Sequence, residues 1–322
     1  MKREFITPTN EAHWHAMRAQ DLTSTDVAAL FGLSPYRTNF ELWHEKKAGE
    51  PVRIKDNDRM RWGRRLEAVV AEGIAEERGW VVRPFKEYGR LADARLGSSF
   101  DFRIIGTGGF FDPPDDAIID QGDSILEIKT VDALAFKNGW TIEDDYVEAP
   151  PHIELQVQHQ MLVSGLRRAY IGVLIGGNRI EVLEREADDQ VHAGIIYAAR
   201  KFWDSIERNE PPAPVMPDDA DAVIRLNQHA EPGKLLDARG DERVAALVAR
   251  YAELGKQAKV IDDERNTIKA DLLTAIGDAE KVLLDGYSIS AGFVGPAEIP
   301  AFTRQGYRNL RVTAKKPAKV AA

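Results

Sequence analysis

The sequence predicts an α/β (α+β) protein with a central mixed β-sheet flanked by helices, followed by a mainly helical extension that carries a small β-hairpin. Two observations predict the first part. Short apolar, β-branched runs bounded by turn residues indicate strands, and amphipathic helical segments alternate with them as far as residue 208. The third observation is the Pro-rich segment 211–217, which is typical of a linker. We therefore expect one domain over residues 1–210 and the extension over residues 218–322.

Composition excludes several classes of protein. The 322 residues are 43% apolar and 30% charged, and no apolar run approaches the ~18 residues that a membrane helix needs. The first residues lack the apolar core of a signal peptide, so a cytoplasmic location is expected. The absence of cysteine excludes disulfides, thiolate zinc sites, iron–sulfur clusters and a cysteine nucleophile. A net charge of −9 argues against a passive nucleic-acid coat, although an enzyme could still reach DNA through a local basic channel.

The N-terminal region is predicted to be helical. A helical pattern covers residues 13–18, and short helices are expected at 27–31 and 39–47. The hydroxyl-rich segment 21–26 precedes the helix at 27–31. One interpretation is a helix cap, and the alternative is a phosphate-binding site that would also use Arg18.

Several strands and one long helix come next. Apolar residues at helical spacing predict a helix over residues 59–78, and Gly79 suits its C-terminal end. Strands are predicted over residues 80–84, 87–91, 96–105 and 124–130. The glycine-rich segment 106–123 lacks the Lys-Ser/Thr of a phosphate loop and is predicted to be a hairpin tip.

The second half contains further helices and hairpins. Helices are predicted over residues 133–140, 152–163 and 188–208, with a strand hairpin at 169–175 and 178–183. Beyond the linker, the charged helix 241–276 has an interrupted heptad pattern, so a helical hairpin or a single arm is expected rather than an extended coiled coil. A small hairpin over 281–291 follows. The tail 304–319 is basic without acidic residues, which suits either a solvated end or a contact with the DNA backbone.

The strand at 124–130 places a carboxylate beside an ammonium. Side chains two residues apart share a strand face, so Glu127 and Lys129 project together while Leu126 and Ile128 face the other side. A metal-dependent phosphodiesterase needs this arrangement, because the carboxylate binds a hard cation and the ammonium lies near the activated water or phosphate. Taken alone, the triplet is more often an amphipathic strand with a solvated salt bridge.

Further polar residues stand in a consistent order along the chain. Glu67 lies at the edge of the apolar arc of its helix, where it is either at the solvent boundary or held inward by a cation. Asp101 lies between two phenylalanines and shares its strand face with Ser99. Gln156 and Gln160 place two amides on one partly apolar helical stripe. The residues alone make a metal nuclease the leading interpretation.

This order resembles the PD-(D/E)xK nuclease superfamily, and more closely its YqaJ-like viral recombinase and lambda-type phage exonuclease family. The motifs that carry the resemblance are Trp14-His15-Ala16-Met17-Arg18, Trp62-Gly63-Arg64-Arg65-Leu66-Glu67, Ser99-Phe100-Asp101, Leu126-Glu127-Ile128-Lys129 and Gln156-Val157-Gln158. The segment 25–36 is similar to the family's N-terminal segment. The chain departs from the family in three ways. Phe100 replaces the proline of the usual Ser-Pro-Asp motif, and the gap between Asp101 and Glu127 is long. The extension after residue 217 is the third departure.

The resemblance implies a restriction-endonuclease-like core and a metal-dependent nuclease site. Asp101 and Glu127 would hold Mg²⁺ together with the backbone carbonyl of Ile128. Glu67 would assist directly or through water, and Lys129 would orient and activate the attacking water. Two ions are expected, with Mn²⁺ able to substitute.

Members of the family also place a glutamine from a helix at the active site and bind the terminal phosphate of their DNA substrate. Gln156 would support the metal-bound water or the scissile phosphate. A pocket in the family receives the terminal 5′-phosphate, and the matching positions here are Arg18, Thr25 and Ser99. An arginine that completes this pocket would fall on Ala135. Either Lys137 substitutes for it, or the dependence on the 5′-phosphate is weaker than in the family.

The resemblance therefore implies a Mg²⁺-dependent 5′→3′ exonuclease, a deoxyribonuclease that digests one strand of linear double-stranded DNA for phage-type single-strand-annealing recombination. It implies DNA ends and a phage annealing protein as partners, a ring trimer as the assembly, and a phage or prophage gene expressed in a bacterial host. The alternatives are an endonuclease, a Cas4-like nuclease, and a non-catalytic DNA-binding module on the same fold. The missing cysteines argue against a Cas4-like enzyme, and the complete Asp101, Glu127 and Lys129 set argues against the binding module.

Overall fold

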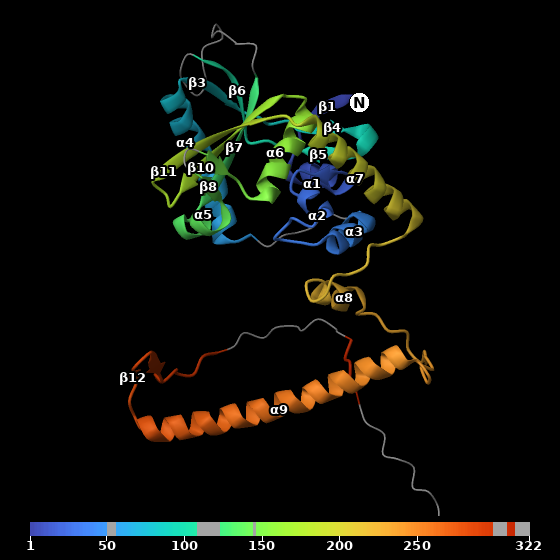
Figure 1. Cartoon of the computed structure of the whole chain (residues 1–322), viewed down its shortest axis with the longest axis vertical. Coiled ribbons are helices and arrows are strands. Elements are labelled where there is room, and N and C mark those ends of the chain that lie inside the picture. The colour runs from blue at the N-terminus through green and yellow to red at the C-terminus, as the bar shows by residue number, and fades with distance from the viewer. Residues whose placement is uncertain (50–55, 108–122, 144–145, 299–307, 313–322) are drawn as a thin grey trace, which may run out of the picture. The chain divides into compact units, whose positions relative to one another are not determined.

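The computed structural model describes residues 1–49, 56–107, 123–143, 146–298 and 308–312 (Figure 1). The chain forms two units, Met1–Val223 and Ile224–Ala322. The segment predicted as a linker, 211–217, falls inside the first unit. Most of the predicted hairpin tip and most of the basic tail lie outside the described residues.

A five-stranded sheet forms the centre of the first unit. Its strands, in spatial order, are β11 (Arg179–Glu186), β10 (Arg168–Ile175), β7 (Ser124–Val131), β6 (Phe102–Thr107) and β3 (Trp80–Pro84). β7 and β10 are parallel, while the other neighbouring pairs are antiparallel. The expected mixed sheet is therefore confirmed.

One helix covers each face of this sheet. α4 (Asp58–Arg78) shares an apolar cluster with Leu126 and Ile128, and α6 (Pro151–Ser164) shares the other cluster with Ile125. The alternation expected for the central strand is thus confirmed, because its even-numbered apolar residues face α4. The odd-numbered Glu127 and Lys129 therefore face α6.

Gly172 on β10 allows α4 to approach the sheet closely. A Cβ at this position would lie 2.5 Å from Cδ1 of Ile74 and 3.1 Å from Cδ1 of Ile128. The fully buried Ile74 side chain occupies the space that any larger residue would need. This contact fixes the distance between α4 and the strands that carry the polar residues.

A second, smaller sheet was not anticipated by the sequence analysis. It consists of β1 (Arg3–Ile6), β4 (Tyr88–Leu91), β5 (Leu96–Ser98) and β2 (Leu22–Thr23). The prediction of one continuous strand over 96–105 is wrong. β5 pairs with β4 and β2, whereas β6 pairs with β3 and β7, so the chain changes sheets at residues 99–101. Asp101 lies in that crossing and not within a strand.

The other elements of the first unit surround these sheets. They are α1 (Glu11–Gln20), α2 (Val27–Leu30), α3 (Asn39–Ala48), a 3₁₀-helix (Ala92–Ala94), α5 (Ala133–Gly139), β8 (Thr141–Glu143), β9 (Tyr146–Glu148) and α7 (Asp189–Arg208). The predicted helices at 133–140, 152–163 and 188–208 are confirmed within a few residues. The helix-cap interpretation of segment 21–26 is wrong, because Asp26 makes no capping hydrogen bond at the start of α2.

The second unit is built around one helix. α8 (Ala220–Leu226) spans the division between the units, α9 (Glu242–Ile276) is a single helix of 35 residues, and β12 (Lys281–Leu284) pairs with β13 (Tyr287–Ser290). The predicted long helix and small hairpin are both confirmed. Among the helices that the structure describes, none is sufficiently long and apolar to cross a membrane.

Candidate active site

The predicted catalytic residues come from separate elements of the first unit. Glu127 and Lys129 lie on β7, Asp101 on the crossing from β5 to β6, Glu67 on α4, and Gln156 on α6. The helices α4 and α6 pack against β7 from opposite faces, and β6 is its neighbour in the sheet. The fold therefore gathers residues that are far apart in the sequence around one strand.

Glu127 is a buried carboxylate with several donors. Its Oε1 accepts hydrogen bonds from Nζ of Lys129 across 2.6 Å and from Nε2 of Gln156. Its Oε2 accepts from Nε2 of Gln160 across 2.7 Å. Glu127 is only 3% exposed, so these donors replace the water that a carboxylate would otherwise bind. They also fix its orientation.

Gln160 is a site residue to which the sequence analysis assigned no role. It is 1% exposed, and its Nε2 also approaches the backbone carbonyl of Ser99 at 3.4 Å. Its Oε1 is buried without a hydrogen-bond partner among the described residues. The signal was present in the sequence, since Gln156 and Gln160 are four residues apart and so share one face of α6. Nothing in that spacing showed that both amides would reach Glu127.

Lys129 is held as a cation between acids. Burial by itself would lower the pKa of Lys129, but the charges of Glu127 and Asp101, with the hydrogen bond to Glu127, leave this pKa above its ordinary value. Nζ of Lys129 also donates to Oε1 of Gln156 across 3.1 Å. The Lys129 ammonium thus donates hydrogen bonds to both Glu127 and Gln156.

Asp101 faces β7 from the crossing between the two sheets. Its Oδ2 accepts a hydrogen bond from the backbone N–H of Ile128 across 2.8 Å. Burial raises the pKa of Asp101 well above its ordinary value, and the negative charge of Glu127 raises it further, while Lys129 opposes this effect. The absence of a strand at this position leaves the carboxylate free to turn toward β7.

Glu67, on α4, is the third acid of this group. It is half-buried on α4. Burial raises the pKa of Glu67, and the charge of Glu127 acts in the same direction. The charge of Glu127 thus disfavours ionisation of both Asp101 and Glu67, and Lys129 only partly offsets this effect.

The donor set suits a hard cation. Carboxylate and carbonyl oxygens are the ligands that Mg²⁺ prefers, and a divalent ion among Glu67, Asp101 and Glu127 would relieve their repulsion. In the described part of the chain, no three His, Cys, Asp or Glu side chains are already grouped to hold a metal ion. The residues therefore fit such an ion by chemical type, and their carboxylates would have to draw together around it.

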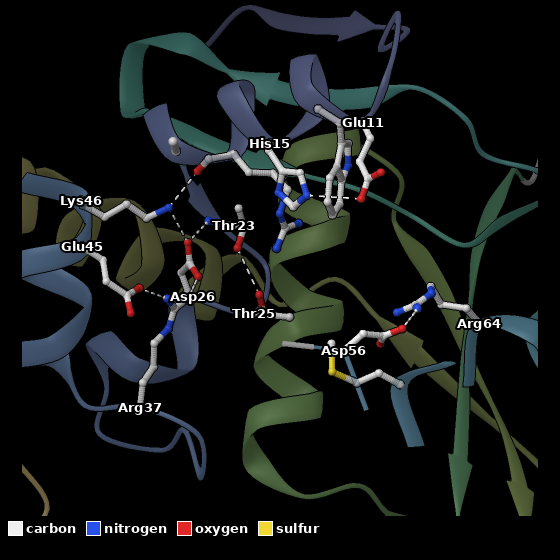
Figure 2. Close-up of a pocket in the computed structure, with 14 residues that line it drawn as sticks. Glu11, His15, Thr23, Thr25, Asp26, Arg37, Glu45, Lys46, Asp56 and Arg64 are labelled. Carbon is white, nitrogen blue, oxygen red and sulfur yellow. Dashed lines mark hydrogen bonds and ion pairs between the residues drawn. The ribbon is translucent and has the colours of Figure 1, made fainter. Parts of the chain in front are cut away.

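A second feature is a cavity of about 490 Å³ bordered by α1, α3 and α4 (Figure 2). Its walls include Trp14, Arg18, Thr23, Thr25, Asp26, Arg37, Lys46 and Arg64. The hydroxyls of Thr23 and Thr25 lie 3.1 Å apart. The structure thus brings the predicted phosphate-site residues Arg18 and Thr25 into one cavity.

Most of the cations around this cavity already have a carboxylate partner. Asp26, which is 2% exposed, forms ion pairs with Lys46, at 2.8 Å between Nζ and Oδ2, and with Arg37. Arg64 pairs with Asp56 across 2.7 Å. Figure 2 shows these pairs lining opposite parts of the cavity. They hold the walls in place and leave little of their charge for a ligand.

Arg18 differs from these cations. Its guanidinium lies 4.6 Å from the ring centre of Trp14, and within the described ranges no carboxylate forms an ion pair with it. Burial lowers the pKa of Arg18, although an arginine remains charged at neutral pH. A half-buried, unpaired guanidinium in the same cavity as two threonine hydroxyls suits an anion.

Ser99 lies between the cavity and the acidic centre. Its Oγ accepts a hydrogen bond from Nε1 of Trp14 across 2.8 Å, and its carbonyl lies near Gln160. Lys137, in contrast, is exposed on α5 and does not belong to the described lining of the cavity. The structure therefore connects Ser99 with both parts of the site and leaves Lys137 outside the cavity.

The chain is similar to several known proteins. Residues 13–167, which contain every predicted catalytic residue, match the model of the YqaJ-like viral recombinase domain. A Bacillus subtilis (strain 168) protein described as the uncharacterized protein YqaJ is 29% identical over 260 residues, which cover 78% of this chain and 76% of that protein. Among solved structures, an alkaline exonuclease (LHK-Exo) from Laribacter hongkongensis is 19% identical, with a TM-score of 0.45 over 61% of this chain and 93% of that chain. The same enzyme in complex with dAMP gives a TM-score of 0.42.

The resemblance that the sequence motifs indicated is thereby confirmed. Residues 13–167 of this chain are similar to the YqaJ-like viral recombinase domain.

Proposed function

We propose that the protein is a metal-dependent deoxyribonuclease that degrades one strand of linear double-stranded DNA in the 5′→3′ direction, for recombination by single-strand annealing. The observation that carries the proposal is the Glu127–Lys129 pair, which the fold holds beside Asp101 and Glu67. The similarity of residues 13–167 to a viral recombinase domain supports DNA as the substrate. A phage annealing protein and a ring-shaped oligomer belong to the proposal through the family resemblance alone.

Asp101, Glu127 and the carbonyl of Ile128 would hold Mg²⁺, or Mn²⁺ in its place, and Glu67 would assist. Bound ions, two in this proposal, would supply an activated water and stabilise the leaving 3′-oxygen. Gln156 and Gln160 orient Glu127 through their amide N–H groups. Burial of these contacts keeps competing water away from the carboxylate.

Lys129 places its ammonium on the same strand face as Glu127. Because its pKa is raised, it stays protonated and can donate a hydrogen bond to the attacking water or to a phosphate oxygen. A positive charge at this position favours the transition state, in which negative charge develops on the phosphate. Gln156, which accepts a hydrogen bond from Lys129, limits the directions in which the ammonium can point.

The cavity beside α1 supplies the basis for end recognition. Arg18 and Thr25 would bind the terminal 5′-phosphate, and Ser99 would connect this contact to the acidic centre through Trp14 and Gln160. A phosphate bound there would position the next phosphodiester bond relative to the acids. Digestion would then begin at ends and proceed in one direction.

The test uses duplex DNA labelled at either the 5′ or the 3′ end, in Mg²⁺ or in EDTA, with closed circular DNA as a second substrate. The proposal expects early loss of the 5′ label, later loss of the 3′ label, no cutting of the circle and no activity in EDTA. Cutting of the circle would indicate an endonuclease. Binding without any cutting would indicate a non-catalytic module.

A further inference from the structure

The helix α9 presents an apolar seam that the other described residues of its own unit leave uncovered. None of its 35 residues is buried. Apolar side chains along it remain largely exposed, for example Leu247 at 61%, Tyr251 at 55% and Ile268 at 50%. An isolated helix is marginally stable in water, and most helices in proteins depend on packing of an apolar face. We therefore expect the apolar face of α9 to pack against a partner.

The seam follows a heptad repeat. Positions alternately three and four residues apart run from one end of α9 to the other, and they are Val244, Leu247, Tyr251, Leu254, Ala258, Ile261, Arg265, Ile268, Leu272 and Ala275. This alternation is the spacing of the a and d positions that face a partner helix in a coiled coil. Arg265, Ala258 and Ala275 are the residues that interrupt the run of large apolar side chains in this heptad pattern. They leave the spacing of the seam positions intact.

We propose that α9 pairs with α9 of a second copy of this chain, in antiparallel orientation. The seam is centred on the helix, because Val244 lies two residues from its start and Ala275 one residue from its end. Two antiparallel copies can therefore align all ten seam positions without overhang, with Leu247 opposite Leu272 and Tyr251 opposite Ile268. At 1.5 Å per residue the contact would extend over about 47 Å.

Arg265 determines the orientation. In a parallel, in-register pair, the two copies of Arg265 would face each other inside the seam, and like charges at close range repel. In the antiparallel pair, each Arg265 faces Leu254 of the other copy and can extend its guanidinium toward solvent. The antiparallel pair also packs its small residues against larger ones. Ala258 faces Ile261 of the other copy, whereas in the parallel pair it would face a second Ala258.

The flanking charges favour the same orientation. Arg250 and Asp271 directly precede the seam positions Tyr251 and Leu272 and so flank the seam on the same side. In the antiparallel register, Arg250 therefore lies opposite Asp271 of the second copy, and this pair occurs twice by symmetry. Gln257 lies opposite Glu264 without conflict. A parallel pair would gain a contact between Glu264 and Lys269, but it would retain the repulsion in the seam.

The first test measures the mass of the full chain by sedimentation equilibrium over a range of concentrations. The wild type should show a pairwise association step, which gives a dimer of single chains, or a pair of rings if the ring-shaped oligomer of the proposed function forms. Leu247→Asp combined with Leu272→Asp should abolish this step. Val260→Asp is the matched control, because Val260 is 64% exposed and lies outside the seam. A monomer at every concentration, or an oligomer that the seam variants do not weaken, overturns the proposal.

The second test is an exchange of charges. Arg250→Asp or Asp271→Arg alone should weaken the dimer about tenfold, because each creates two like-charge contacts. An equimolar mixture of the two single variants should regain the wild-type affinity, since each mixed dimer restores both opposite-charge contacts. Failure of the mixture to recover would contradict the antiparallel register.

Orientation can be read directly, because the chain contains no cysteine. Val244→Cys and Ala275→Cys are prepared as separate variants, mixed and oxidised. An antiparallel pair gives disulfides between the two different variants. Disulfides that join only identical variants would show a parallel pair and overturn the proposed arrangement.

Discussion

Gln160 donates a hydrogen bond to Glu127, with 2.7 Å between Nε2 and Oε2, from the middle of a helix that covers one face of the central sheet. The contact occupies the carboxylate oxygen that Lys129 and Gln156 leave free. Both partners are almost completely buried. The orientation of the central carboxylate therefore depends on α6 as much as on its own strand.

Replacing Gln160 with leucine should weaken both stability and activity. Loss of the amide leaves Oε2 of Glu127 buried without this donor, which should cost about 1–3 kcal/mol of unfolding free energy. The metal-dependent rate should also fall, because Glu127 would lose its fixed orientation. Urea denaturation and a nuclease assay measure the two effects. Gln158→Leu is the matched control, because its amide bonds to Glu186 and Asp188 outside the acidic centre, so it should lower stability without a comparable loss of rate.

Replacing Arg18 with alanine should remove the preference for 5′-phosphorylated ends. The wild type should degrade phosphorylated ends faster than hydroxyl ends, and the variant should degrade both at similar, reduced rates because the unpaired guanidinium is gone. Lys137→Ala, exposed on α5, is the control and should keep the preference. If Lys137→Ala loses the preference and Arg18→Ala keeps it, the cavity is not the phosphate site.

Asp101→Asn should stabilise the protein when metal is removed. The pKa of Asp101 is raised in the folded state by burial and by Glu127, so the folded protein binds this proton more tightly than the unfolded chain does. The unfolding free energy therefore falls as pH rises toward the folded pKa, and asparagine escapes this loss. The melting temperature in EDTA should be higher for the variant at about pH 8, with the difference shrinking on acidification.

Mg²⁺ should reverse that order. An ion that binds only the folded wild type raises its melting temperature, whereas the asparagine variant lacks the ligand charge and should respond little. The apparent affinity of the wild type for Mg²⁺ should increase with pH, because protons must leave the carboxylates before the ion binds. Equal responses of both proteins to Mg²⁺ would argue against Asp101 as a ligand.

Gly172→Val should destabilise the first unit by about 1–3 kcal/mol, since the new side chain would collide with Ile74 and force α4 away from the sheet. Thermal unfolding measures the effect. Gly194→Ala in α7 is the matched control. Apart from its chain neighbours and its own helix backbone, no atom of the described residues lies within 4 Å of the added Cβ. Because alanine also favours helix, the control should be neutral or stabilising. A stable Gly172→Val protein would contradict the close packing of α4.

Local patterns in the sequence were sufficient for the main elements. The 3.6-residue period located α4 and α6, and the two-residue alternation correctly placed Glu127 and Lys129 on the face opposite Leu126. These features depend only on neighbouring residues. The mixed central sheet followed from the order of the strands and helices.

Features that depend on distant contacts were not predictable in the same way. Residues 96–105 have the composition of one strand, but pairing partners from elsewhere in the chain divide it between two sheets. Likewise, the role of Gln160 requires the packing of α6 against β7, which no local spacing encodes. The partners of Asp26, namely Arg37 and Lys46, also come from outside its own segment.

The central claim is that the Glu127–Lys129 pair belongs to a catalytic centre and is more than a structural ion pair. The most direct measurement compares wild type with Lys129→Ala for DNA hydrolysis in Mg²⁺, with DNA binding and melting temperature recorded for both. Lys201→Ala, exposed on α7, is the control. The account predicts a loss of hydrolysis of about a hundredfold or more for Lys129→Ala, with DNA binding retained. Hydrolysis at the wild-type rate by a folded Lys129→Ala protein would contradict it.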